Sequence, residues 1–378
     1  MSKSIAAKNA AIVTAITGLL FFACANIYAT FKLKQLRSIS YRPHEKYTIG
    51  KRYESNTNET EATAFGDLCA ISGAQNEQQC PFSAGKRTAK FETDSRGWKT
   101  SEALEGSDFV IVGDSFLAAL GGDGNNAQLG QELKRITGKK FYEAAHPGDP
   151  GDYLLRVDEL ERENPIGKKY ILLIFEGNDL AVKSKSVGFS FRPYQPEGNP
   201  LLFKVRHILD RLVYDLKNPP IAKLLSIYLE SERLQRLRST HVAADASFTI
   251  RIHNKLHAFG VNNQLVSRDP DLSLPMSMDP NEMGYIGKNI KCVVFVPTKY
   301  STYLADESLF ERHPKLRHDF TGLTKSGIRV IDLTPSLRRA ARSGNSDQDI
   351  WWTDDTHWNR NGIKVAARTI ASDSECLK

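Results

Sequence analysis

The chain has 378 residues, of which 40% are hydrophobic, 25% charged and 9% aromatic. This length allows one large domain or two modest ones with an ample core, and the aromatic content excludes wholesale disorder. The formal net charge of +7 favours anionic partners. No zinc-finger spacing, RNP-like string or dense Lys/Arg block occurs, so we expect no nucleic-acid partner.

The first element is an apolar segment. Residues 10–31, AAIVTAITGLLFFACANIYATF, are 22 residues without a charge, with lysines on both sides. About 20 apolar residues span a bilayer as a helix, whereas a cleavable signal peptide has a shorter apolar core and a small-x-small cleavage site. We expect an uncleaved signal-anchor over residues 1–34, with a cleaved signal peptide as the alternative and lipidation of Cys24 as a weaker one. The flanking charges do not decide its orientation.

The cysteines indicate export. Besides Cys24 in the apolar segment, the chain has Cys69, Cys80, Cys292 and Cys376, which allow three pairings. We favour Cys69 with Cys80, which lie close together in a polar, glycine-containing region, and consider Cys292 with Cys376 as a second disulfide. No C-x-x-C is present, so we expect no metal or redox site. Disulfides predict an exported, periplasmic location.

The rest of the chain alternates between strand and helix patterns. We expect a stalk and an irregular segment over residues 35–90, and the patterned domain over 91–378. Apolar runs typical of buried parallel strands lie at 108–113, 139–148, 169–177, 291–297 and 328–333. Helical patterns lie between them, at 127–138, 152–163 and 304–327. This alternation predicts an α/β fold, a doubly wound parallel sheet flanked by helices in a flavodoxin-like, three-layer arrangement.

Residues about 181–285 interrupt the alternation. FRPYQPEGNP has the composition of a loop. Two basic, amphipathic helical patterns follow, one ending at Pro219 and one over 221–238. We expect a helical insertion that covers the site or lies on a membrane. A solvated charged face on a packing helix is the more common meaning of such a basic run.

A Gly-Asp-Ser sequence leaves the first of these strands, in FVIVGDSFLAAL, residues 109–120. The Ser115 hydroxyl is then placed where a strand ends and a helix begins, where backbone N–H groups are free and anionic charge is stabilised. The same residues suit an ordinary strand end, because Gly and Asp favour turns and Ser is a good N-cap. A nucleophile is the better interpretation only if a base, an orienting acid and oxyanion donors occur elsewhere.

Candidate partners lie at the ends of other strands and before the last helix: Gly148, Asn178, Asp354, Asp355 and His357. In a doubly wound sheet these points converge on one edge. A histidine can take the proton of a serine hydroxyl with one ring nitrogen while a carboxylate holds the other nitrogen. The backbone N–H groups of Ser115 and Gly148, with the side-chain amide of Asn178, are the expected donors to the oxyanion formed from an ester.

Together these residues resemble the four blocks of the SGNH (GDSL-type) hydrolase superfamily. The blocks are Gly113-Asp114-Ser115, Gly148, Asn178 and a final Asp-x-x-His or Asp-x-His. The resemblance covers roughly residues 91–372, with 181–285 as an insertion. Glu176 departs from it, because the family usually has Gly at that place.

The final block leaves two aspartates open as the triad acid. The superfamily spacing selects Asp354, whereas the string Asp-Thr-His-Trp resembles the cell-envelope branch, the alginate-type O-acetyltransferases, and selects Asp355.

The resemblance implies a membrane-anchored serine esterase or O-acyltransferase. It would act on acyl esters, with acetyl favoured, of an envelope or secreted polysaccharide through an acyl-serine intermediate. No metal or organic cofactor is implied. If the protein is a transferase, the resemblance implies a multi-pass membrane acyltransferase as partner. The alternative is a catalytically silent SGNH-like domain that binds glycan or scaffolds an assembly, because a fold need not imply activity.

Overall fold

The chain divides into two compact units in a computed structural model. One unit is Met1–Gly50 with Glu197–Thr240, and the other is Lys51–Pro196 with His241–Lys378. The structure describes residues 13–14, 16–29, 48–49, 52–53, 55–63, 66–71, 80–82, 84–85, 87–118, 127–145, 156–157, 160–161, 167–176, 221, 247–260, 289–303, 324, 327–343 and 348–378.

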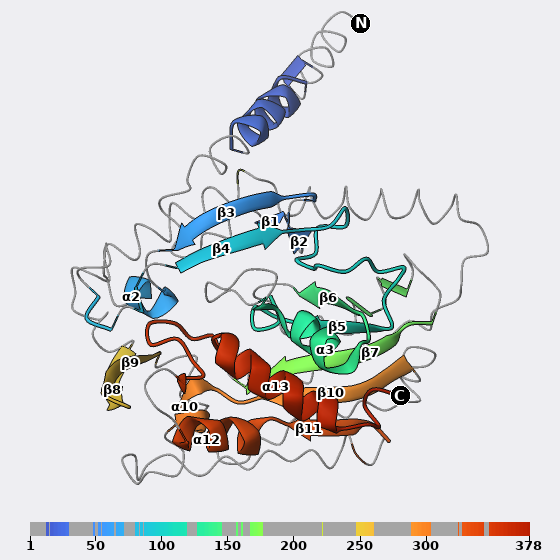
Figure 1. Cartoon of the computed structure of the whole chain (residues 1–378). Coiled ribbons are helices and arrows are strands. Elements are labelled where there is room, and N and C mark those ends of the chain that lie inside the picture. Colours follow the sequence, from blue (N-terminus) through green and yellow to red (C-terminus); the bar gives the residue numbers. More distant parts are fainter. Residues whose placement is uncertain are drawn as a thin grey trace, which may run out of the picture. The chain divides into compact units, whose positions relative to one another are not determined.

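In the first unit, residues 16–29 form a helix, drawn in dark blue (Figure 1). Its large apolar side chains include the exposed residues Ile16, Leu19, Leu20, Phe21, Phe22, Ile27 and Tyr28. Among the described residues, no helix combines the length and the apolar character that a bilayer crossing needs. The signal-anchor over residues 1–34 therefore stays a prediction. Strand β1 (Thr48–Ile49) also belongs to this unit.

The second unit is built on a parallel sheet. Its strands are β5 (Phe109–Gly113), β6 (Phe141–Ala145), β7 (Lys169–Phe175), β10 (Ile290–Val296) and β11 (Arg329–Asp332). They lie in the order β6-β5-β7-β10-β11, all parallel (Figure 1). Counted along the chain this order is 2-1-3-4-5, that of flavodoxin-like folds. The predicted α/β class with a parallel sheet is confirmed.

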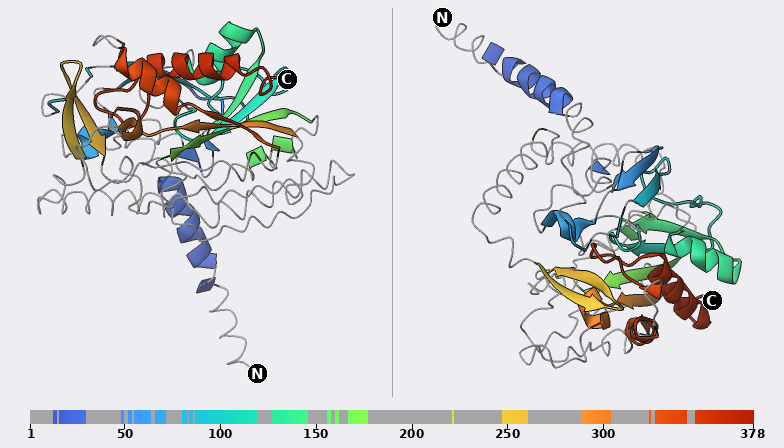
Figure 2. Two further views of the ribbon diagram at one scale, coloured as in Figure 1. Left: turned by 90° about the horizontal axis from the view of Figure 1, so that it is seen from below. Right: turned by 60° about the vertical axis from the view of Figure 1, so that its left-hand side comes forward.

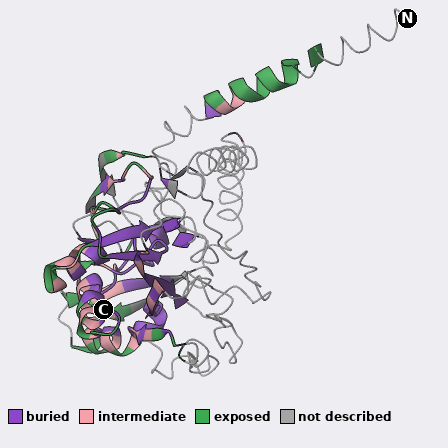
Figure 3. Ribbon diagram, turned by 90° about the vertical axis from the view of Figure 1, so that its right-hand side faces the viewer, coloured by how far each residue is buried: buried purple, intermediate pink, exposed green. Residues whose placement is uncertain are grey.

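Alternate side chains of these strands build an apolar core on each face of the sheet. The helices α3 (Leu129–Thr137), α12 (Thr334–Arg342) and α13 (Arg360–Ser372) cover one face together (Figure 2). The other core includes Trp98 and Leu104, with Val157 and Leu160 from helical residues. The strands β5 and β6 are consequently buried along their whole length, β7 and β10 along most of it, and the edge strand β11 is partly exposed (Figure 3).

The second unit begins at Lys51, whereas the sequence placed the start of the patterned domain at residue 91. Two mainly polar strands explain the difference. After the short strand β2 (Arg52–Tyr53), β3 (Asn58–Thr63) pairs antiparallel with β4 (Arg87–Glu92). Because these strands carry few apolar side chains, their sequence gives little sign of regular structure.

The insertion predicted over residues 181–285 contains a β-hairpin that we did not expect. Strands β8 (Ser247–Ile252) and β9 (Lys255–Gly260) pair antiparallel. They are joined by His253 and Asn254, whose φ angles are 47° and 65°. Positive φ at both central residues is typical of a two-residue hairpin turn. The expected basic helices, except for Ile221, lie outside the described residues.

The carboxyl ends of the central strands lie at one edge of the sheet. Gly113 at the end of β5 pairs with Ala145 at the end of β6, and Phe175 at the end of β7 pairs with Val296 at the end of β10. The segments that follow these strands therefore start from one edge. The order in which the strands are added to the sheet reverses between β5 and β7, and ligands of such folds bind at this switch point. Ser115 lies two residues beyond β5.

Candidate active site

Ser115 lies in a tight turn directly after β5. The Asp114 carboxylate accepts the Phe116 N–H at 2.9 Å, and the Asp114 carbonyl accepts the Ala118 N–H at 3.2 Å. A Cβ on Gly113 would meet the Cβ atoms of Leu117 and Leu173 at 3.1 Å, so the close approach of this turn to β7 suits glycine. The local sequence thus leads the chain sharply off the strand and presents the Ser115 hydroxyl at the edge of the sheet.

A closed loop, residues 351–358, carries the histidine. Trp351 and Trp358 pair as an antiparallel bridge at its two ends. The helix α13 begins directly after it, where the Asn359 side chain accepts the N–H groups of Asn361 and Gly362. A Cβ on Gly362 would lie 2.4 Å from the Ile350 carbonyl oxygen, so this end of the loop needs glycine. The 351–358 loop is therefore held at both ends.

The structure brings Ser115, His357 and Asp355 together in one hydrogen-bonded series. His357 Nε2 lies 2.8 Å from Ser115 Oγ, and His357 Nδ1 lies 2.6 Å from Asp355 Oδ1. The same Asp355 oxygen accepts the His357 backbone N–H at 2.9 Å. All three side chains are buried. This is the arrangement in which a histidine takes a serine proton while a carboxylate fixes its tautomer.

Electrostatics keep Asp355 ionised. Burial opposes the charged form, but the neighbouring His357 and Arg87 outweigh it and hold the pKa of Asp355 well below its usual range. An ionised carboxylate at this position accepts the Nδ1–H proton of His357. Nε2 is then the nitrogen that faces Ser115 without a proton.

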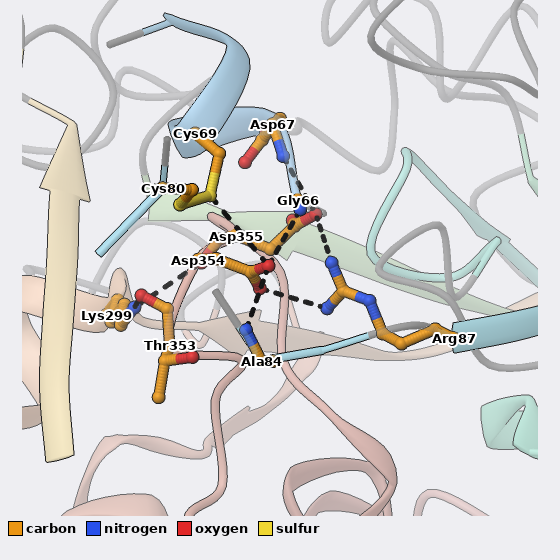
Figure 4. The surroundings of a disulfide bond; sticks show 10 residues. All are labelled: Gly66, Asp67, Cys69, Cys80, Ala84, Arg87, Lys299, Thr353, Asp354 and Asp355. Carbon is orange, nitrogen blue, oxygen red and sulfur yellow. Dashed lines mark hydrogen bonds and ion pairs between the residues drawn. A yellow bond between two sulfur atoms is a disulfide. The ribbon is translucent and has the colours of Figure 1, made fainter. Parts of the chain in front are cut away.

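The second aspartate of the pair has different partners (Figure 4). Asp354 Oδ1 lies 3.1 Å from an Arg87 nitrogen, and Asp354 Oδ2 accepts the N–H groups of Gly66 at 2.8 Å and Ala84 at 3.2 Å. Burial raises the pKa of Asp354, against the attraction of Arg87. Of the two aspartates that the sequence left open, Asp355 is the one in contact with His357.

Apart from His357, the partners described for both aspartates come from the disulfide segment, Gly66 to Arg87. Within it, Cys69 is joined to Cys80, the pairing favoured from the sequence. The helix α2 (Asp67–Ile71) starts beside the 351–358 loop, where the Asp67 N–H reaches Asp355 Oδ2 at 3.2 Å. The Asp67 carboxylate accepts hydrogen bonds from the backbone N–H and from the hydroxyl of Thr356, at 2.9 and 2.7 Å. Sequence reasoning assigned this segment no part in the site.

A second disulfide joins Cys292 in β10 to Cys376. It fastens the end of the chain to the sheet on the face that α13 covers. This was the further pairing considered from the sequence.

Glu176, which departs from the family block, has a structural role. It follows β7 and is fully buried. Its carboxylate accepts the Thr298 N–H at 2.6 Å and the Ser301 hydroxyl at 2.9 Å. It thereby connects the end of β7 to α10 (Lys299–Tyr303), the short helix after β10.

Two predicted oxyanion donors, Gly148 and Asn178, lie outside the described residues. They follow β6 and β7, the strands on either side of β5. Their role stays a prediction.

An aromatic wall supports the histidine. The Phe116 ring lies 4.9 Å from the His357 ring, and the Phe116 carbonyl accepts the Trp358 indole N–H at 3.0 Å. Phe116 also stacks on Phe175 with ring centroids 3.9 Å apart. These contacts link the residue after Ser115 to the residue after His357.

Among the described residues, one group has the donor set for a metal ion: Asp67, Asp355 and His357. Each of these side chains already hydrogen-bonds within the site, Asp67 to Thr356 and Asp355 to His357. The donor set is that of a triad and its support, and we derive no metal chemistry from it.

Comparison with known families agrees with this geometry. Residues 288–376 match the family described as "SGNH hydrolase-like domain, acetyltransferase AlgX". The match confirms the resemblance over the segment that holds β10, β11, α13 and the 351–358 loop. In this AlgX-type segment lie Asp355 and His357, whereas Ser115 lies before it. A comparison with curated proteins gave no significant match.

Proposed function

We propose that the protein is an SGNH-type O-acetyltransferase that acts on a polysaccharide through an acyl-serine intermediate. The observation that carries this proposal is the series from Ser115 Oγ through the His357 ring to Asp355, with separations of 2.8 and 2.6 Å. The AlgX-type match supports acetyl as the group moved and a polysaccharide as the acceptor. Esters of other acyl groups are included in the proposal only because the same triad can attack them.

In the first half of the reaction, His357 Nε2 takes the proton of Ser115 as Oγ attacks the carbonyl carbon of the acyl donor. Asp355 stabilises the imidazolium that forms. The ester C–O bond then breaks, and His357 returns the proton to the leaving oxygen. Ser115, Gly148 and Asn178 are the proposed oxyanion donors.

In the second half, a sugar hydroxyl gives its proton to His357 and attacks the acyl-serine, which releases Ser115 with its proton restored. Water in place of the sugar gives hydrolysis. Both outcomes use the same triad, so hydrolysis of a small acetyl ester reports on it directly.

A serine-directed fluorophosphonate tests the proposal. We expect the purified protein to be labelled at Ser115, as located by peptide mass mapping, and S115A and H357A to lose both labelling and turnover of an aryl acetate. S343A, which removes an exposed serine hydroxyl, is the control and should be labelled normally. Absence of labelling in the wild-type protein, or unchanged labelling of S115A, would support the silent glycan-binding or assembly scaffold.

Transfer is tested separately from hydrolysis. Addition of an unacetylated anionic polysaccharide should speed release of the aryl alcohol and leave acetyl groups on the polymer, as measured by NMR. Release of acetate alone, with no acetylated polymer for any acceptor, would make the protein an esterase.

We also propose an exported location with the segment at residues 10–31 as membrane anchor. Two disulfides support an oxidising compartment, and the exposed apolar side chains of the helix at 16–29 support contact with lipid. A multi-pass membrane acyltransferase is the proposed source of acyl groups.

A further inference from the structure

Lys299 is a fully buried lysine that the proposed chemistry does not use. It is the first residue of α10, at the carboxyl end of β10. Within the described part of the chain, its ammonium group donates hydrogen bonds to main-chain carbonyls, which belong to Trp352 at 2.6 Å, Ala258 at 2.8 Å, Thr353 at 3.2 Å and Asp355 at 3.5 Å. Figure 4 shows the side chain reaching Thr353 beside Asp355.

These carbonyls belong to one short stretch of chain and to the strand beside it. Three come from the 351–358 loop just before His357, and the fourth comes from β9, whose Ala258 N–H also donates to the Thr353 carbonyl at 2.8 Å. Carbonyl oxygens that converge in this way repel one another, and a buried carbonyl without a donor is costly. The Ala258 N–H serves the Thr353 carbonyl, and the three hydrogens of the ammonium group suffice for the other three carbonyls.

Charged side chains lie on both sides of the 351–358 loop. Asp67, Asp354 and Asp355 are carboxylates, and Arg87 is the cation paired with the two of the 351–358 loop. Burial lowers the pKa of Lys299 to about 7, against the attraction of these carboxylates. Arg87 binds the carboxylate side of the loop, and Lys299 binds its carbonyl side. The additional positive charge on His357 during the reaction then meets a site with a surplus of carboxylates.

We propose that Lys299 is a positioning residue, which holds the backbone of residues 352–355 so that Asp355 and His357 stay aligned with Ser115. Its prediction for the reaction rate rests on the proposed function. Its prediction for the geometry of the loop does not, and can be measured separately.

The test compares K299M with K168M. Lys168 is also buried and also donates to main-chain carbonyls, those of Ser107 at 2.7 Å and Glu105 at 3.1 Å, but it precedes β7 at the opposite end of the sheet. Both variants remove a buried ammonium group and keep a chain of similar length. If Lys299 only stabilises the fold, the two variants should behave alike.

For aryl acetate hydrolysis, measured well below each variant's melting temperature, we expect K299M to lose about 100-fold in kcat with little change in KM. Displacement of a catalytic group by about 1 Å has an effect of that size. K168M should stay within about twofold of the wild type in kcat. The downfield proton resonance of His357 Nδ1–H, which reports the hydrogen bond to Asp355, should shift or disappear in K299M and persist in K168M.

If K299M does not fold, K299Q gives the same comparison. Its uncharged amide keeps two N–H donors for the carbonyls. A folded K299M or K299Q with wild-type kcat and an unchanged Nδ1–H resonance would overturn the proposal. If wild-type Ser115 proves unreactive to fluorophosphonate, the proposed function fails, whereas the resonance still tests the role of Lys299.

Discussion

The sharpest test of the site separates its two neighbouring aspartates. Both oxygens of Asp355 accept hydrogen bonds, Oδ1 from the Nδ1–H and N–H of His357 and Oδ2 from the N–H of Asp67. An asparagine has one acceptor oxygen, so in D355N the NH2 group must face a donor on one side. If it faces Nδ1, the imidazole adopts the wrong tautomer.

The loss expected for D355N is about 10⁴-fold in kcat, the size found for an orienting acid of this kind. This corresponds to about 5 kcal/mol of activation free energy. D354N instead removes one charge of the buried pair with Arg87, whose atoms lie 3.1 Å apart. Breaking a buried pair from one side costs about 3–5 kcal/mol of unfolding free energy. For D354N we therefore expect a marked loss of stability and a much smaller loss of kcat.

The assay measures kcat for an aryl acetate per active site, with sites counted by fluorophosphonate titration, and measures the free energy of unfolding in urea. Counting sites removes the effect of unfolded protein from the rate. Equal losses of kcat in D354N and D355N, or a larger loss in D354N, would refute the assignment of Asp355 as the orienting acid.

Other predictions concern the surroundings of the site. Burial raises the pKa of Glu143 to about 8 from its usual 4.5. Between these two pH values the folded state keeps a proton that the unfolded state loses, so the free energy of unfolding should fall by about 1.4 kcal/mol per pH unit as pH rises. E143Q should lack this fall in urea titrations. G66A, whose new Cβ would lie 2.2 Å from a main-chain oxygen of the 351–358 loop, should lower kcat and the melting temperature, whereas G106A, with open space around it, should change neither. Replacement of both Cys69 and Cys80 by serine should lower kcat as well as stability, because their segment binds both aspartates; unchanged kcat would contradict that link. A reporter enzyme that functions only outside the cytoplasm should be active when fused to the C-terminus and should fractionate with membranes; activity of a cytoplasmic reporter there would disprove export.

The sequence allowed the sheet and the placement of Ser115 and His357 at one site to be predicted because their signals are local. The strands β5, β7 and β10 are continuous apolar runs, and Ser115 and His357 lie in short strings next to such elements. The choice between Asp354 and Asp355 was not accessible in this way. It depends on the conformation of the 351–358 loop. Residues far away in the chain, such as Gly66 and Asp67, help to determine that conformation.

The disulfide segment escaped prediction for a physical reason. It supports the site largely through backbone N–H groups, such as those of Gly66 and Ala84, and every non-proline residue has such a group. Lys299 gave no signal either, because one buried charge in a sequence looks like any surface charge, and Glu176 was visible only as a departure from the family block. The β8–β9 hairpin did offer a sign, an alternating stretch around His253 and Asn254.

The contact between the disulfide segment and the 351–358 loop also bears on when the protein becomes active. Gly66 and Asp354 are 288 positions apart in the chain. Long-range contacts of this kind form late, since the intervening chain must first be ordered. During synthesis from the N-terminus, the first half of the site exists before the last loop is made. The triad is thus completed only after His357 has emerged, and a shorter nascent chain carries an unassembled, inert site.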